Sequence, residues 1–412
     1  MPKNIVAVQT ALMPAFYKDF HCLAKDCRDS CCLGWKIEFN KKDYLAIKRG
    51  VDGTKDGELK DLCARSMSRL REKEHDGMYA EFPASVKGRC GFLREDGLCA
   101  LQLGCGEGTL PKVCKTFPRL VRQTMAAKEL SLTPACEGVL ALLWDLPDGI
   151  DFIEEPLEKK DCKRYEAANP VAARFADIRA LCIDVLQDRS LRLSRRMLLL
   201  GVLLQRLREA DWEAEGTADE WLAWAEPMLG NPTVAAELDG LPGDRRLFMA
   251  NNHRVMTTSM LGKNTSDAQL AQELWSAIII TVPEQEENKF TVTYDLERYQ
   301  ALEDKLEELL GHSDCFFENL MVAVDFHLSF PDLTDPEKLW ESYVNLCNLY
   351  SLFRFAAVCG CAKEVSRERL FHVLVEISRA LLHNSARRNQ LRDEFFQHDS
   401  ATLAHMAILV GG

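Results

Sequence analysis

The chain has 412 residues, 47% of them hydrophobic and 28% charged, which is typical of a globular protein with two or three domains. Its net charge of −12 comes from 51 Lys and Arg against 63 Asp and Glu. This charge argues against nucleic acid as the main partner, because neutralising phosphates requires a basic face. No stretch approaches the roughly 18 uninterrupted apolar residues that a membrane span needs, so we expect no membrane association.

The first segment, residues 1–20, contains a short apolar run with one Lys before it. Gln9, Pro14 and the lack of a small-residue cleavage signal argue against a secretory peptide, so we expect a cytoplasmic protein. In such a reducing compartment, 16 cysteines indicate metal ligation or burial rather than a disulfide framework. Ten of the cysteines fall within residues 22–136, which favours metal ligation in that part of the chain.

The candidate metal ligands form two groups in the sequence. The candidates are Cys22, Cys27, Cys31 and Cys32, followed by Gly34-Trp35, and then Cys90, Cys99, Cys114 and Cys136. Thiolates select zinc or iron–sulfur clusters, and four ligands complete either centre. Paired C-x2-C knuckles are missing and His is scarce here, which favours a [4Fe–4S] cluster, with zinc as the alternative. We expect four of the eight to bind, and adjacent Cys31 and Cys32 not to bind the same metal ion.

Seven further cysteines are predicted to be free thiols that pack as small apolar side chains. They are Cys63, Cys162, Cys182, Cys315, Cys347, Cys359 and Cys361. A radical S-adenosylmethionine loop, C-x3-C-x2-C, is not present. Cys27-x3-Cys31 supplies its first interval, but the third position is Gly34.

The stretch "LQLGCGEGTL", residues 101–110, resembles the glycine loop of class I methyltransferases. Such a loop needs an apolar strand before it, a helix after it and an acidic residue about twenty positions on, where Glu129 stands. The preceding "EDGLC" is too short and polar for a buried strand, and Pro111 and Cys114 interrupt the start of the helix. We therefore expect no Rossmann-like domain, and tight glycine turns between cysteine ligands instead.

A boundary rich in Pro, Gly and charge lies at residues 145–161. It predicts an irregular cysteine-rich metal-binding module with minor β structure over residues 1–145. Residues 146–412 are predicted to form a multi-helix body, so the fold class is mainly α. Apolar residues at three- and four-residue spacings predict helices at 169–187, 190–212 and 294–311, with a loop or hairpin near 281–294.

Two helix starts carry local signals. Thr217 and Glu220 form a Thr-x-x-Glu pattern, which predicts a capping box. Residues 334–337, Thr-Asp-Pro-Glu, predict a second helix start with Pro in the first turn.

The cysteine pattern resembles the flagellin lysine-N-methylase family. The matching pieces are "FHCLAKDCRDSCCLGWKI", "RCGFLREDGLCALQLGCGEGTLPKVCKTFPR" and "LSLTPACEG", with further likeness at 316–333 and 376–384. The first two are also similar to a broader zinc- or iron-chelating cysteine-cluster domain. The family's recurring cysteines fall on the eight candidates, whereas Cys105 stands where another residue is expected. The family tends to have Cys-Pro-Glu after "SLT", but here Pro134 precedes Cys136 and Glu137 follows it directly.

The resemblance implies transfer of methyl groups from S-adenosylmethionine to surface lysines of flagellin, with an iron–sulfur cluster in the cysteine module. The helical body would then bind the cofactor and the protein substrate. Candidates for the lysine channel are Glu318, Asp325 and His327, on or next to an apolar helix. Ordinary structural roles for these polar residues are the alternative.

Three further residues are candidates for cofactor binding. Arg379 and His383 lie four apart, on one helix face, and could bind a carboxylate or form an interhelical contact. Trp35 could stack on adenine or belong to a core.

Two other classes of function remain open at this level. One is a non-enzymatic zinc- or iron-binding adaptor whose helical part grips a partner. The other is an iron–sulfur redox protein. An acidic surface would tolerate a lysine-bearing protein partner.

Overall fold

A computed structural model of the chain describes residues 5–33, 37–70, 77–83, 88–241, 243–260, 265–283 and 290–411. The chain divides by its contacts into two compact units. The smaller unit comprises residues 20–120 and 136–138, and the larger comprises residues 1–19, 121–135 and 139–412. Residues 121–135 and 139–145 therefore pack with the larger unit, although the sequence analysis placed them in the cysteine-rich module.

The smaller unit combines a short sheet with four helices. Its strands are β3 (Ile37–Phe39), β4 (Ser68–Arg69) and β5 (Ala80–Phe82), and its helices are α1 (Lys41–Gly53), α2 (Gly57–Ser66), α3 (Ala100–Cys105) and α4 (Lys112–Thr116). The sheet is antiparallel with β5 between β3 and β4. Asn40 and Asp56 cap α1 and α2 by accepting from the third backbone N–H beyond them, which fixes both helix starts. The phenylalanines Phe39, Phe82 and Phe92 pack together in its core.

The larger unit contains the rest of the described strands. They are β1 (Ile5–Val8), β2 (Thr10–Pro14), β6 (Arg119–Gln123), β7 (Lys128–Leu132), β8 (Phe152–Pro156), β9 (Lys163–Glu166), β10 (Ile279–Pro283) and β11 (Phe290–Tyr294). One sheet has the order β6-β7-β2-β8, with β2 parallel to β7 and antiparallel to β8. β1 pairs with β9 and β10 with β11, the latter confirming the predicted hairpin. None of the sheets described has the central run of parallel strands that a Rossmann-like domain requires.

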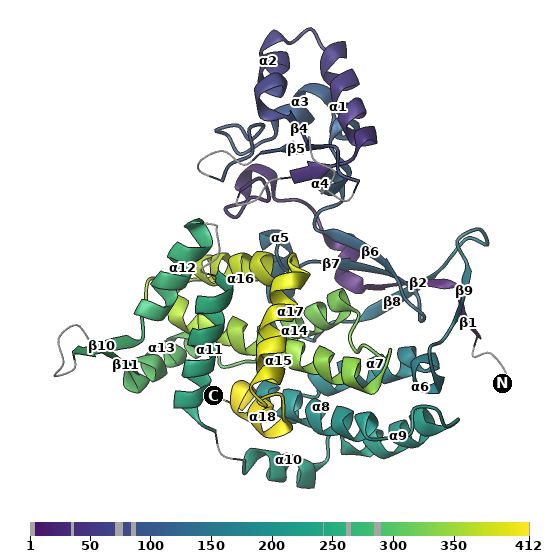
Figure 1. Cartoon of the computed structure of the whole chain (residues 1–412), viewed down its shortest axis with the longest axis vertical. Helices are drawn as coiled ribbons and strands as arrows, with labels where there is room; N and C mark the ends of the chain where they lie inside the picture. The colour runs from purple at the N-terminus through teal and green to yellow at the C-terminus, as the bar shows by residue number, and fades with distance from the viewer. Residues whose placement is uncertain are drawn as a thin grey trace. The chain divides into compact units, whose positions relative to one another are not determined.

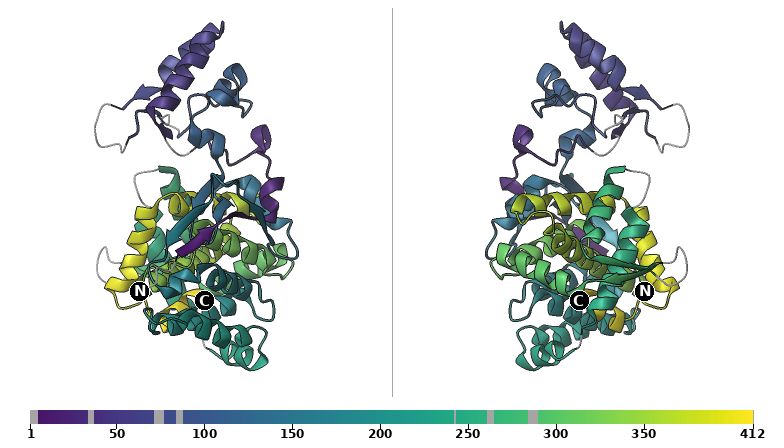
Figure 2. Two further views of the ribbon diagram at one scale, coloured as in Figure 1. Left: turned by 90° about the vertical axis from the view of Figure 1, so that its right-hand side faces the viewer. Right: turned by 90° about the vertical axis from the view of Figure 1, so that its left-hand side faces the viewer.

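Most of the larger unit is helical. Its helices are α5 (Glu137–Trp144), α6 (Pro170–Ala173), α7 (Phe175–Gln187), α8 (Leu193–Arg208), α9 (Thr217–Ala225), α10 (Pro232–Asp239), α11 (Arg245–Met260), α12 (Thr265–Ser276), α13 (Leu296–Leu309), α14 (Cys315–Leu328), α15 (Pro336–Gly360), α16 (Arg367–Leu382), α17 (Ser385–Gln397) and α18 (Leu403–Gly411). The 25-residue α15 runs through the middle of this body and contacts α8, α13, α16 and α18 (Figures 1 and 2). The predicted mainly α fold is confirmed. No helix in the described part of the chain has both the length and the apolar character for crossing a membrane.

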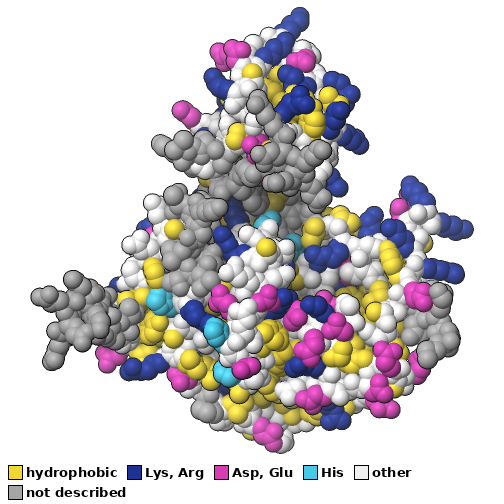
Figure 3. Space-filling view, in the orientation of Figure 1, with side chains coloured by type: hydrophobic (Ala, Val, Ile, Leu, Met, Phe, Trp, Pro, Cys, Tyr) yellow, Lys and Arg dark blue, Asp and Glu magenta, His cyan; other side chains and the backbone are white. Residues whose placement is uncertain are grey.

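Local details confirm some sequence predictions and correct others. α15 begins at Pro336 with Asp335 as its cap, as the Thr-Asp-Pro-Glu pattern predicts. The predicted helix at 169–187 is two helices, because Arg174 has non-helical dihedral angles. The predicted capping box at Thr217 is wrong. Gly216 caps α9 with φ 86°, and the Thr217 hydroxyl instead donates to the carbonyl of Asp211 at 2.6 Å. Charged side chains of both signs are spread over the visible face of the larger unit (Figure 3).

The contact between α8 and α15 depends on a glycine. Gly201 lies on α8 directly against the ring of Tyr343 on α15, so a Cβ at this position would collide with the phenol. The Tyr343 hydroxyl is buried and donates to the carbonyl of Met197 at 3.1 Å. Packing of the two helices therefore requires the absence of a side chain at residue 201.

We expect Gly201→Ala to lower the free energy of unfolding of the larger unit by about 1–3 kcal/mol, because the added methyl overpacks this contact. Gly240→Ala is the matched control, since Gly240 is exposed, has φ −70° and would place a Cβ only in ordinary contact. Urea unfolding followed by circular dichroism measures both. Equal stability of the two variants would contradict the tight approach.

Candidate functional site

All eight candidate cysteines line one cavity of the smaller unit. The cavity measures about 290 Å³ and contains Cys22, Cys27, Cys31, Cys32, Cys90, Cys99, Cys114 and Cys136 in its lining. Cys105 does not line it and packs against the unit's hydrophobic core, as Cys63 does. The glycine-rich stretch forms α3 and a turn at Gly106, where φ is 81°. It therefore connects cysteines within this unit, as predicted.

Backbone pairing brings the later cysteines together. The backbone N–H of Cys90 donates to the carbonyl of Cys32 at 2.8 Å. Leu93 and Cys99 form an antiparallel bridge, which folds the segment between Cys90 and Cys99 back on itself. Burial, followed by the thiols of Cys32, Cys90 and Cys99, raises the pKa of Cys114 far above its usual range. These four thiols are therefore close neighbours.

A second set surrounds Glu137. The Glu137 carboxylate Oε2 accepts the backbone N–H groups of Arg28 at 2.7 Å and Asp29 at 3.0 Å, and it lies 3.4 Å from Cys27 Sγ. Burial, Glu137 and the thiols of Cys136 and Cys22 raise the pKa of Cys27. Glu137, whose position departs from the family pattern, thus fixes the loop after Cys27 beside Cys136.

The donor set fits a thiophilic metal centre. Eight thiols line one cavity, and thiolates are soft ligands that a bound metal ion generates outright by displacing the thiol proton. In the described residues, no three or more His, Cys, Asp or Glu side chains already stand in an arrangement that could hold a metal ion. The chemistry of the lining therefore fits a thiolate-bound metal centre. The thiols would have to move closer together to bind it.

The polar residues of α14 are fully buried in the larger unit. Glu318 forms ion pairs with Arg189 at 2.8 Å and with Arg196, and these two arginines satisfy both of its oxygens. Asn319 donates to the carbonyls of Leu143 and Leu146 at 2.9 and 2.8 Å. Both side chains therefore hold α14 to its neighbours.

Asp325 and His327 lie further along the same helix. Asp325 is 0% exposed, neither of its carboxyl oxygens has a hydrogen-bond partner in the described structure, and burial raises its pKa well above the usual range. His327 Nδ1 lies 3.2 Å from Ser131 Oγ. Burial and the nearby Arg122 guanidinium lower the pKa of His327 to about 3. Burial therefore favours the protonated form of Asp325 and leaves His327 uncharged at neutral pH.

Arg379 and His383 are near enough for the Arg379 guanidinium to lower the pKa of His383, after the larger effect of burial. Arg379 forms an ion pair with Glu376 at 3.0 Å, one turn away on α16. His383 follows α16, and its Nε2 lies 3.5 Å from Thr133 Oγ1. Trp35 lies outside the described residues.

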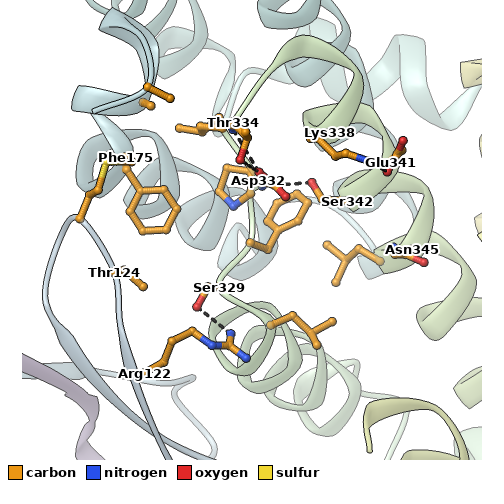
Figure 4. Close-up of a pocket in the computed structure, with 18 of the residues that line it drawn as sticks. Arg122, Thr124, Phe175, Ser329, Asp332, Thr334, Lys338, Glu341, Ser342 and Asn345 are labelled. Carbon is orange, nitrogen blue, oxygen red and sulfur yellow. Dashed lines mark hydrogen bonds and ion pairs between the residues drawn. The ribbon is translucent and has the colours of Figure 1, made fainter. Parts of the chain in front are cut away.

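A larger cavity of about 700 Å³ opens in the helical unit (Figure 4). Its lining comes from the β6–β7 turn, the segment from β9 through α6 to the start of α7, the loop between α14 and α15, α15 itself and α17. The charged side chains in the lining are Arg122, Asp332, Lys338, Glu341, Arg388 and Arg392. Glu341 pairs with Lys338 and Arg392, each at 2.8 Å. The buried Oδ1 of Asn345 has no hydrogen-bond partner in the described structure, which leaves an acceptor at the cavity for a ligand.

A buried network holds one wall of this cavity. The alternation of β7 puts Glu129 and Ser131 on the same buried face. Glu129 forms an ion pair with Arg179 of α7 and accepts from Ser329 Oγ at 3.1 Å. Arg122 donates to Ser329 Oγ at 2.7 Å and to the carbonyl of His327 at 2.8 Å (Figure 4). The network thus positions the end of α14, where Ser329 has φ 55°.

Sequence reasoning missed this cavity. Its lining residues come from separate segments and carry no motif, so only the fold brings them together. The one available signal was the unusual polarity of "KELSL" on an otherwise apolar strand, where Glu129 and Ser131 are buried.

Comparison with known proteins finds relatives that are named as lysine N-methylases or flagellar proteins. Residues 179–409 match the family model of the FliB lysine N-methylase C-terminal domain. The chain is 30% identical over 244 residues to proteins named lysine-N-methylase from Salmonella choleraesuis and Salmonella typhimurium, which covers 58% of this chain and 58% of each relative. It is 31% identical over 149 residues to flagellar biosynthetic protein FliU of Salmonella muenchen, or 35% of this chain and 83% of that protein. No solved structure matches.

The aligned region thus spans less than two thirds of the two lysine-N-methylases. The residues matched by the family model include the loop between α14 and α15 and the cavity residues on α15 and α17. The cysteine-rich unit lies outside that match.

We expect Arg179→Met to lower the free energy of unfolding of the larger unit by about 3–5 kcal/mol, because it leaves the Glu129 carboxylate buried without its counter-charge. Lys160→Met is the matched control, since Lys160 and Glu158 form an exposed pair and should matter little. Urea unfolding measures both variants. Similar losses in the two would show that the buried pair does not hold the cavity wall.

The neutral state of His327 predicts a pH dependence of stability. Its pKa is lower in the folded chain than the value of about 6.5 in the unfolded chain, so its contribution is complete above pH 6.5 and is lost as pH falls towards 3. Relative to His327→Asn, the native chain should lose up to about 2 kcal/mol between pH 7 and pH 5. Denaturant midpoints of both proteins at the two pH values test this. Parallel pH profiles would contradict it.

Proposed function

The chain belongs to the FliB lysine N-methylase family, and on that premise we propose that it is an S-adenosylmethionine-dependent lysine N-methyltransferase acting on flagellin. The observation that carries the proposal is the family match over residues 179–409, which contain much of the lining of the larger cavity. The names of the aligned relatives, lysine-N-methylase and a flagellar biosynthetic protein, support both the reaction and the kind of substrate.

The cavity has the properties of a cofactor pocket. Its volume of about 700 Å³ lies within the range of roughly 300–1,000 Å³ for small-molecule sites. Arg122, Arg388 and Arg392 provide cations for a ligand carboxylate, and Asp332 provides a carboxylate for hydroxyl or amino groups. Phe175 offers an aromatic surface (Figure 4). A zwitterionic amino acid joined to a nucleoside matches this mixture of groups.

S-adenosylmethionine supplies a methyl group on a sulfonium, and the acceptor is the side-chain nitrogen of a lysine. The nitrogen must be the neutral amine, because the ammonium form, with a pKa near 10.4, has no free electron pair. Nitrogen–carbon bond formation and carbon–sulfur bond cleavage then leave one proton to be removed from nitrogen. Asp332 is the carboxylate that the cavity offers as acceptor, because Glu341 is already paired with Lys338 and Arg392. Alignment of the two reactants accounts for much of the acceleration expected from such a site.

The Glu318, Asp325 and His327 side chains do not fit the role of base in this reaction. Glu318 is held by two arginines, and Asp325 and His327 are buried away from the cavity lining. Their contribution is to position α14, whose C-terminal end borders the cavity.

We propose further that the cysteine-rich unit binds a [4Fe–4S] cluster. Methyl transfer to an amine is a polar displacement and needs no electron transfer. The cluster would therefore stabilise the irregular backbone of this unit, in which the loops around Cys27 and between Cys90 and Cys99 converge.

The direct test is incubation of the anaerobically purified protein with isotope-labelled S-adenosylmethionine and flagellin, followed by mass spectrometry of flagellin peptides. We expect label on lysine side chains. Label on no protein at all, with the metal site loaded and the fold intact, would overturn the proposed reaction in favour of an adaptor.

A substitution in the cavity tests whether S-adenosylmethionine binds there. Asn345→Leu keeps a similar volume but removes the unpaired acceptor, so we expect about a tenfold rise in KM for S-adenosylmethionine, the value of one lost hydrogen bond. Asn251→Leu on α11 is the control, because Asn251 is also half-buried but lies outside the cavity. Steady-state kinetics compare the two. An unchanged KM in Asn345→Leu would place the cofactor elsewhere.

A further inference from the structure

The cysteine cavity holds twice the ligands that one centre needs. A tetrahedral zinc ion or a [4Fe–4S] cluster takes four protein ligands, and eight thiols line this cavity. Cys63 and Cys105 show where spare thiols of this unit lie, since they pack against its hydrophobic core and do not line the cavity. The other eight are therefore distinguished from ordinary free thiols by their position.

Four of the eight cavity cysteines form a group that packs on the hydrophobic core of the smaller unit. Cys32, Cys90, Cys99 and Cys114 all pack against the same hydrophobic core as Phe82 and Phe92. The Cys90 N–H bond to the Cys32 carbonyl and the bridge at Cys99 fix three of them, and α4 carries the fourth. Each of Cys90, Cys99 and Cys114 interacts electrostatically with Cys32.

The remaining four stand apart from that core. Cys22, Cys27, Cys31 and Cys136 are not among the residues packed against it. Glu137 links the loop after Cys27 to the residue next to Cys136, and Cys27 interacts with both Cys22 and Cys136. Cys31 interacts with Cys32 first, and also with Cys136 and Cys114, so it stands at the junction of the two groups. Because Cys32 is hydrogen-bonded to Cys90 and packs on the core while Cys31 does not, Cys31 is the thiol left to complete the second group.

We infer that the smaller unit binds two thiolate-ligated metal centres side by side, one held by Cys32, Cys90, Cys99 and Cys114 and the other by Cys22, Cys27, Cys31 and Cys136. Adjacent Cys31 and Cys32 then serve different centres, as happens in two-cluster ferredoxins, where one cysteine of a run ligates the other cluster. The inference rests on the proposed cysteine ligation of metal and not on methyl transfer.

Metal stoichiometry tests the inference. The full chain is isolated anaerobically, and iron, zinc and acid-labile sulfide are quantified per chain. Two clusters give about eight iron and eight sulfide, and a cluster beside a zinc ion gives about four iron and one zinc. Either result supports two centres. A total of four iron without zinc, or of one zinc without iron, overturns the inference.

Matched double variants assign the ligands. Cys90→Ser with Cys99→Ser should remove one centre, and Cys27→Ser with Cys136→Ser should remove the other, so each retains only the metal of the remaining centre. Cys63→Ser with Cys105→Ser is the control from the same unit and should retain all of it. Loss of all metal from both test variants, with unchanged far-ultraviolet circular dichroism, would show that the eight thiols serve one centre.

The methyl-transfer assay on the same preparations separates the two proposals. Two centres without methyl transfer would leave this inference intact and overturn the proposed function. Methyl transfer by a chain with one metal centre would support the proposed function and overturn this inference.

Discussion

The convergence of eight thiols on one cavity is the constraint on which the smaller unit depends. Its hydrophobic core cluster contains twelve fully buried side chains, few for a segment of this length, and its helices are short. Neutral thiols that lie beside one another and beside Glu137 contribute little to the folding stability of this unit. Bound to metal they would become anchors for loops that have little other packing, because binding free energy then contributes to folding.

The larger unit uses buried charge for a different purpose. Glu318 with its two arginines and Glu129 with Arg179 fix α14 and β7, and the cavity opens where these elements end. The buried polar side chains of α14 thus serve its packing, while the charged side chains of the cavity stand on the loop after α14 and on α15 and α17. This separation of support from chemistry is what a pocket for a polar cofactor requires.

The general architecture could be predicted from the sequence, because helical periodicity and the clustering of cysteines are local signals. The exact ends of the helices were harder to predict from the sequence. The break at Arg174 and the cap at Gly216 depend on backbone angles that the residue pattern of 169–187 and Thr217 does not specify. The large cavity could not be predicted, since its residues are drawn from five segments. Glu129, considered only as a ribose ligand, proved to be a buried partner of Arg179, because tertiary packing decided its role.

The path of the chain has a consequence for biosynthesis. Strand β2 (Thr10–Pro14) pairs with β7 and β8, which follow it by more than a hundred residues, and nearly the whole smaller unit is encoded in between. On the ribosome β2 cannot pair with β7 until Lys128–Leu132 has emerged, nor complete its pairing with β8 until Pro156 has emerged. Cys136 emerges shortly before, so the last thiol of the cavity and the sheet of the larger unit become available almost together. Completion of the cysteine cavity and closure of the sheet therefore fall in the same brief interval of synthesis.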